Sequence, residues 1–109
     1  MNNTNFLNYK HEKDKIKQWI YPVFFSTKSG AKKIKIINSV NVESKRISTI
    51  GNETNLSYSD VKYNIDILEQ KKFLIKINKK YIISKKFREN YDVLHNISHP
   101  HKSGNPGNS

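Results

Sequence analysis

The stretch LSYSDVKYNIDILEQKKFL, residues 56–74, decides the fold because it specifies both the start and the faces of a helix. Ser57 is a residue type that caps helices, and Asp60 three positions later predicts a capping box. Apolar residues then recur at the spacing of one buried helical face, at Val61, Ile65 and Leu68. The far side carries only polar residues and a tyrosine, which predicts a helix over about residues 58–71 with one outward polar face.

The next segment, FLIKINKKYIIS at residues 73–84, predicts a β-hairpin. Its β-branched and aromatic residues lie on both sides of Asn78 and Lys79. Asn78 suits a tight turn with left-handed backbone, whereas Lys79 stands where glycine is preferred. Lys76, Lys79 and Lys80 would then crowd the tip of the hairpin.

Two helices are expected before this stretch. A stripe of Ile34, Ile37 and Val40 predicts the first, over about residues 29–40, with its lysines at 32, 33 and 35 pointing away from the core. In the second, Ile47 and Ile50 point inward. Gly51 lowers helix propensity, so we expect a close helix crossing there, and Asn55 tolerates the left-handed backbone that ends a helix.

Amphipathic helices are also expected at both ends. Ile16, Trp19 and Ile20 predict a helix that Pro22 should end near residue 20 or 21. Phe87, Tyr91 and Leu94 predict a last helix over about residues 85–97. The central helices and the hairpin can form a core without them, so these two stripes would stay exposed in a monomer. We therefore expect a homodimer, with dimerisation residues Ile16, Trp19, Ile20, Phe87, Tyr91 and Leu94.

The 109 residues suit a single small domain, and their net charge of +11 favours a polyanionic partner. Nucleic acid is the leading partner, with an anionic membrane surface or an acidic protein as alternatives. The chain has no cysteine, which excludes disulfides, thiolate metal sites and cysteine nucleophiles. We expect a flexible N-terminus at residues 1–12, a domain at residues 13–97 and a disordered tail at residues 98–109.

The sequence also bears on location and chemistry. It has no apolar run long enough to span a bilayer, and its first residues lack the apolar core of a signal peptide. A cytoplasmic, nucleoid-associated protein is therefore expected. No phosphate-cradling loop or catalytic constellation is evident, so we expect neither an enzyme nor a cofactor. His95 and His99 lack further ligands and are interpreted as exposed histidines, not as a metal site.

The order of elements predicts a mainly α (α+β) fold, a winged helix-turn-helix with flanking N- and C-terminal helices. Residues 25–84 resemble archaeal ArsR-like winged helix-turn-helix transcriptional regulators. Gly51 stands at the small position of their central block, the turn matches residues 55–58, and the Leu-x-x-Leu-Glu pattern matches residues 65–69. The sequence departs from that pattern at Thr54, where leucine is usual, and at Lys72, where glycine commonly ends the helix. The resemblance implies DNA binding and dimerisation through terminal helices. The cysteines of the family's metal sensors are missing, so metal sensing is not implied.

The function expected from this fold is sequence-specific binding of double-stranded DNA in transcription regulation. The recognition helix, about residues 58–71, would enter the major groove, with base contacts from Tyr58, Ser59, Lys62 and Tyr63. The wing, about residues 73–84, would lie on the backbone, with phosphate contacts from Ser57, Lys76, Lys79 and Lys80. Between residues 57 and 86, eight lysines outnumber three acids for a net charge of +5.

Other interpretations of the polar face stay open. Most polar helix faces are simply solvated, and only the helix-turn-helix context and the basic hairpin favour DNA contact. A winged helix can also serve as a protein–protein module or as a non-specific, chromatin-like DNA-binding module. No small-molecule effector is identifiable from the sequence.

Overall fold

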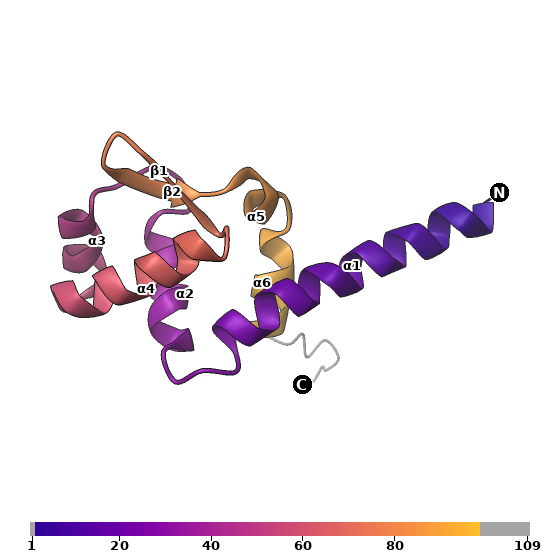
Figure 1. The fold of residues 1–109 in the computed structure, drawn as a ribbon, viewed down its shortest axis with the longest axis horizontal. Coiled ribbons are helices and arrows are strands. Elements are labelled where there is room, and N and C mark those ends of the chain that lie inside the picture. The colour runs from indigo at the N-terminus through magenta and orange to yellow at the C-terminus, as the bar shows by residue number, and fades with distance from the viewer. Residues whose placement is uncertain (1, 99–109) are drawn as a thin grey trace, which may run out of the picture.

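The computed structural model describes the backbone of residues 2–98 and the side chains of residues 12–94. This part of the chain is mainly helical with one two-stranded antiparallel sheet, arranged as Figure 1 shows. The elements are α1 (Asn2–Phe24), α2 (Gly30–Ser39), α3 (Ile47–Thr54), α4 (Tyr58–Gln70), β1 (Leu74–Ile77), β2 (Lys80–Ile83), α5 (Lys85–Glu89) and α6 (Tyr91–Ser98). The tail expected to be disordered lies, after Ser98, outside the described residues.

The central helices α2, α3 and α4 pack against one another through the stripes that periodicity predicted. Their fully buried apolar residues are Ile36, Ile37, Val40, Ile50, Val61, Ile65 and Leu68. Asn55 ends α3 with a left-handed φ of 60°, as expected. The contacts with α2 and α3 thereby fix the orientation of α4. The opposite side of α4 faces solvent.

The start of α4 has only half of the predicted capping box. The Ser57 hydroxyl accepts a hydrogen bond from the Asp60 amide at 3.1 Å. The Asp60 carboxylate does not bond back to Ser57; it binds the Lys32 ammonium of α2 at 3.0 Å. The acid therefore joins two helices, and the serine alone caps α4.

The hairpin is confirmed. β1 and β2 pair in antiparallel register with Leu74 opposite Ile83 and Ile77 opposite Lys80. Asn78 and Lys79 form the two-residue turn, with φ of 51° and 67°, the left-handed values of a type I′ turn. Lys45, between α2 and α3, exchanges backbone hydrogen bonds of 3.0 and 2.7 Å with Tyr81 of β2, which ties the hairpin to the helical core.

Helix α1 contradicts the expectation that Pro22 ends it near residue 20. The helix runs from Asn2, within the segment assigned to a flexible N-terminus, to Phe24 with Pro22 inside its last turn. A proline there removes its own amide donor and crowds the carbonyl four residues earlier, but the later bonds of the turn still form. The amide of Phe25 still reaches the Tyr21 carbonyl at 2.9 Å, and the Ser26 hydroxyl donates to the Pro22 carbonyl at 2.6 Å.

The expected last helix is two helices. α5 ends at Glu89, and Asn90 has a φ of −122°, outside the helical range. The Asn90 amide bonds to the Phe87 carbonyl at 3.0 Å, and its side-chain amide donates to the Lys86 carbonyl at 2.9 Å. These local bonds turn the chain between α5 and α6, a competition with helix that is typical of asparagine.

The terminal apolar stripes lie inside the single chain, so the premise that they would be exposed in a monomer is wrong. Ile16, Ile20, Phe87 and Leu94 are between 0% and 7% exposed, while Trp19 and Tyr91 are partly buried against the same core. α1 packs against α2 and α6, which supplies this burial. These residues are therefore not available as the main contacts of a subunit interface.

An aromatic cluster joins the terminal helices to the end of α4. The rings of Trp19 and Phe73 stack with centroids 4.3 Å apart, and Phe24 and Phe87 each meet Phe73 edge-on at 5.0 Å. Edge and stacked geometries of this kind favour aromatic packing beyond area alone. Phe73, the first core residue after α4, thus packs α1 and α5 against the end of the central helices.

Candidate nucleic-acid interface

The four residues predicted to contact bases lie together on the solvent side of α4. Tyr58 and Tyr63 are 67% and 61% exposed, and Ser59 and Lys62 are exposed as well. We call these four residues the α4 edge. Large exposed rings on a helix are unusual for a merely solvated face, because burial of aromatic area is favourable.

Lys62 of the α4 edge is paired along its own helix. Its ammonium lies 3.1 and 3.4 Å from the two carboxylate oxygens of Asp66. The hydrogen bond that Lys62 donates to Asp66, followed by the negative charge of Asp66, raises the pKa of Lys62. Both side chains are about half exposed, so solvent screens the pair and Lys62 can exchange Asp66 for another anion.

Ser57, predicted to contact phosphate, has its hydroxyl engaged in the structure. Its oxygen accepts from the Asp60 amide and lies 3.2 Å from the Ser59 hydroxyl. The residue is exposed at the first turn of α4, where free amides and the helix dipole favour an anion. The Ser57 hydroxyl therefore serves first as the cap of α4, and this role is already fulfilled without a ligand.

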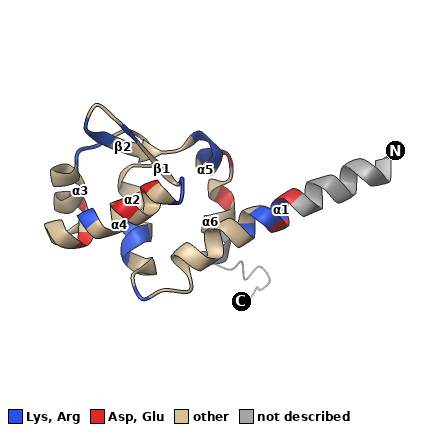
Figure 2. Cartoon of the chain, viewed as in Figure 1, with Lys and Arg blue, Asp and Glu red and all other residues tan. Residues whose placement is uncertain are grey.

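The three predicted wing lysines are exposed on the hairpin, and the hairpin lies beside the α4 edge. The Lys76 ammonium lies 5.6 Å from the ring centre of Tyr81, and strand β1, which carries Lys76, packs against α4. Lys79 and Lys80 follow at the turn. Figure 2 shows positive residues on the hairpin and α5 and both signs of charge along α4.

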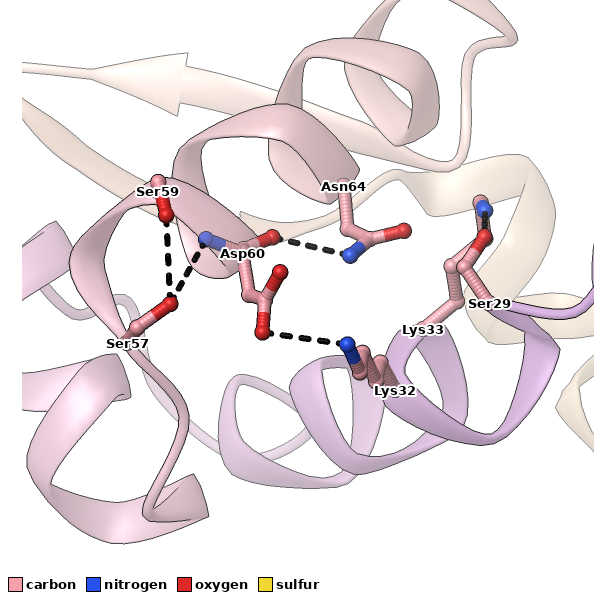
Figure 3. Close-up of polar contacts among 7 residues, drawn as sticks. All are labelled: Ser29, Lys32, Lys33, Ser57, Ser59, Asp60 and Asn64. Atoms are coloured by element: carbon pink, nitrogen blue, oxygen red, sulfur yellow. Dashed lines mark hydrogen bonds and ion pairs between the residues drawn. The ribbon is translucent and has the colours of Figure 1, made fainter.

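Two buried polar residues near this surface escaped the sequence analysis. Lys33, expected to point away from the core, is 2% exposed, and its ammonium donates to the Ser29 hydroxyl. Asn64 of α4 is 1% exposed; its side-chain amide donates to the Asp60 carbonyl at 2.8 Å, whereas its Oδ1 has no partner among the described residues. Figure 3 shows Asn64 on α4 near the Lys32–Asp60 pair, and Lys33 together with Ser29.

The signal for these two residues was present in the spacing. Lys33 precedes Ile37 by four positions and Val40 by seven, and Asn64 lies three after Val61 and four before Leu68. Both therefore fall on the buried stripe of their helices. Their polarity, not their periodicity, misdirected the prediction.

Other chemistry finds little support in the part of the chain that is described. No group of three His, Cys, Asp or Glu side chains within it could hold a metal ion, and the four histidines have side chains outside it. None of its helices combines the length and the apolar character needed to cross a bilayer.

Comparison with protein-family models gave no match, and comparison with curated proteins found no relative of the chain. The resemblance to archaeal ArsR-like regulators therefore stays a prediction. The candidate interface rests on geometry and charge alone.

Proposed function

We propose that the protein is a sequence-specific double-stranded DNA-binding transcriptional regulator with a winged helix-turn-helix fold. In this proposal α3 and α4 form the helix-turn-helix, and the β1–β2 hairpin is the wing. The order of elements supports the assignment, since a short turn at residues 55–57 joins the two helices and the hairpin follows α4 directly.

One observation carries the proposal: the α4 edge stands in solvent beside a hairpin that carries three exposed lysines. The first turns of a recognition helix meet base edges in the major groove. Lys62 can donate to guanine O6 and N7, and Ser59 can donate or accept. Tyr58 and Tyr63 offer a ring for a thymine methyl group and a hydroxyl for a polar edge.

The wing supplies affinity without sequence information in this proposal. Lys76, Lys79 and Lys80 would contact phosphates, releasing counterions and making affinity strongly dependent on salt. The turn at Asn78 and Lys79 holds these ammonium groups at the end of a short, paired hairpin. A rigid support of this kind reduces the entropy lost on binding.

The proposal includes a homodimer, because paired half-sites need two recognition helices. With the terminal stripes buried, the dimer must use another surface. The outer side of α1 offers Tyr21, which is 53% exposed beside Lys17 and Pro22. Sedimentation of wild-type protein and Tyr21→Glu tests this: a dimer that Tyr21→Glu dissociates is expected, and a wild-type monomer bound to a single half-site would contradict it.

The function is tested by selecting bound duplexes from a random pool and then measuring affinities of variants for the selected and a scrambled duplex. Lys62→Ala should change the preferred sequence at a cost of about 1–3 kcal/mol on the selected duplex. Lys79→Ala should weaken both duplexes alike. Lys28→Ala, which removes the same charge in the α1–α2 loop, is the control. Failure of the wild-type protein to bind any duplex at low salt would refute the proposal.

A second candidate, a protein–protein module, is favoured by the outer face of the hairpin. Ile75 and Ile77 of β1 are 42% and 52% exposed, although phosphate contact needs no apolar residue there. Exposed apolar residues on an edge strand favour contact with another protein surface. Binding of an acidic protein that is lost in Ile75→Ser/Ile77→Ser, together with no affinity for duplex DNA, would favour this candidate.

A further inference from the structure

A cavity of about 440 Å³ lies between the end of α1, the start of α2 and the C-terminal half of α4. Its size falls within the range of small-ligand sites. Trp19, Val23 and Ile67 provide apolar wall, Lys33 and Lys71 provide positive charge, and Tyr63 forms part of the rim. No Asp or Glu among the described residues lines it.

Lys33 is the unusual member of this wall. It is 2% exposed, its ammonium donates to the Ser29 hydroxyl, and no carboxylate of the described residues lies within ion-pair distance. A buried ammonium without a counter-charge is costly, and a hydroxyl partner does not neutralise it. Burial accordingly lowers the pKa of Lys33. An anion in the cavity would remove this cost.

The apolar wall is held in place by its own contacts. The Trp19 indole Nε1 donates to the Lys71 carbonyl at 2.8 Å, and its ring stacks on Phe73. Val23 is buried, and Ile67 lies on α4 one turn after Tyr63. A preformed apolar wall beside a buried cation fits a ligand with a flat apolar body and one negative group.

We propose that this cavity binds a small aromatic carboxylate, with the carboxylate paired to the Lys33 ammonium and the ring against Trp19, Val23 and Ile67. Lys71 adds positive charge at the opening. Tyr63 belongs to both the cavity rim and the α4 edge, so an occupant would touch the surface assigned to DNA. The binding test needs no DNA, and its outcome is independent of the proposed function.

The single tryptophan of the chain lines the cavity, so its fluorescence reports occupancy. Benzoate is the probe, and benzamide, which has the same ring without the charge, is the control at equal ionic strength. We expect a saturable change with a Kd on the order of 1 mM for benzoate and binding at least about tenfold weaker for benzamide. No saturable change, or equal affinity for both probes, would overturn the proposal.

Variants locate the site. Lys33→Met keeps an unbranched apolar stem, one atom shorter than lysine, but removes the charge, and should weaken benzoate binding at least about tenfold. Lys35→Met, on the exposed side of α2, removes the same charge and should bind like wild type. If Lys33→Met does not fold, judged by circular dichroism, Ile67→Phe narrows the cavity and should weaken both probes. If whichever of these two variants is folded binds benzoate with unchanged affinity, benzoate does not bind in this cavity.

Discussion

At the scale of single residues, two helical glycines differ in what an added methyl group would meet. At Gly30 a Cβ atom would lie 2.0 Å from the Phe24 carbonyl oxygen, because the start of α2 passes directly against the end of α1. At Gly51 the nearest atoms would be 3.6 and 3.8 Å away, an ordinary contact distance. The expectation of a close helix crossing at Gly51 is therefore wrong. The close approach is between Gly30 of α2 and the end of α1.

Alanine substitutions separate the two cases. Gly51→Ala should raise the free energy of unfolding by up to about 1 kcal/mol, since alanine restricts the unfolded chain and favours helix. Gly30→Ala should lower it, since the backbone of Phe24 must move. Urea unfolding measures both, and a Gly51→Ala protein less stable than wild type would contradict the described packing.

Lys72 occupies the left-handed position at the end of α4. Its φ is 74°, its amide bonds to the Glu69 carbonyl at 3.0 Å, and the Phe73 amide bonds to the Leu68 carbonyl at 2.8 Å. This is a Schellman ending, which favours glycine. Lys72→Gly should therefore stabilise the protein by up to about 1 kcal/mol in thermal unfolding.

The neighbouring Lys71→Gly is the matched control for that change. Lys71 has a φ of −87°, so glycine gains nothing there and should destabilise the chain. Equal effects of the two substitutions would show that charge removal, and not backbone strain, decides the result.

Lys33 makes stability depend on pH with a definite sign. Because burial lowers the pKa of Lys33 in the folded chain, the charged form is penalised by folding. The penalty is complete below the folded pKa and vanishes above the unfolded value, about 10.4. Lys33→Met should therefore be more stable than wild type near neutral pH.

The gain from Lys33→Met should shrink as the pH rises between these two pKa values. Urea unfolding of both proteins at several pH values measures it, with Lys35→Met as the control for loss of surface charge. A difference that stays constant up to the unfolded pKa would mean that Lys33 is not charged and buried.

At the scale of elements, two serine caps differ in how much structure they join. Ser84 accepts from the Phe87 amide at 3.2 Å and donates to the Lys72 carbonyl at 2.8 Å, so it links α5 to the end of α4 across the hairpin. It is 9% exposed. Ser57 caps α4 from an exposed position.

Removing each hydroxyl should reveal this difference. Ser57→Ala should cost about 1 kcal/mol, the usual value for an exposed cap. Ser84→Ala should cost more, about 1–3 kcal/mol, because the Lys72 carbonyl also loses its partner in a part-buried bond. Denaturant unfolding compares them, and a smaller loss at Ser84 than at Ser57 would contradict the linking role.

The sequence predicted the elements where local patterns agreed. The bounds of α2 and α4 and the hairpin turn followed from periodicity, a serine cap and an asparagine, all of which act within a few residues. The errors at Pro22 and Asn90 arose because side-chain hydrogen bonds to nearby carbonyls, which apolar periodicity does not reveal, satisfy the backbone there. For the site, exposure of the α4 edge followed from its spacing, whereas the burial of Lys33 was missed because its charge outweighed the same kind of spacing signal.

At the scale of the whole molecule, the terminal helices bury their apolar stripes in the core of the single chain and need no second subunit to cover them. Phe73 connects α4 to α1 and α5, so the orientation of the α4 edge depends on the ends of the chain. The strong positive charge is then carried on a surface with a fixed shape. We therefore propose that the α4 edge and the hairpin together lie across a duplex.

Backbone amide NMR spectra recorded while a short duplex is added at low salt test that claim most directly. We expect the largest shifts at residues 57–63 and 76–80, small shifts along α1 and α6, and a loss of the effect as salt rises. Shifts confined to α1 and α6, or a spectrum unchanged by duplex, would contradict the account.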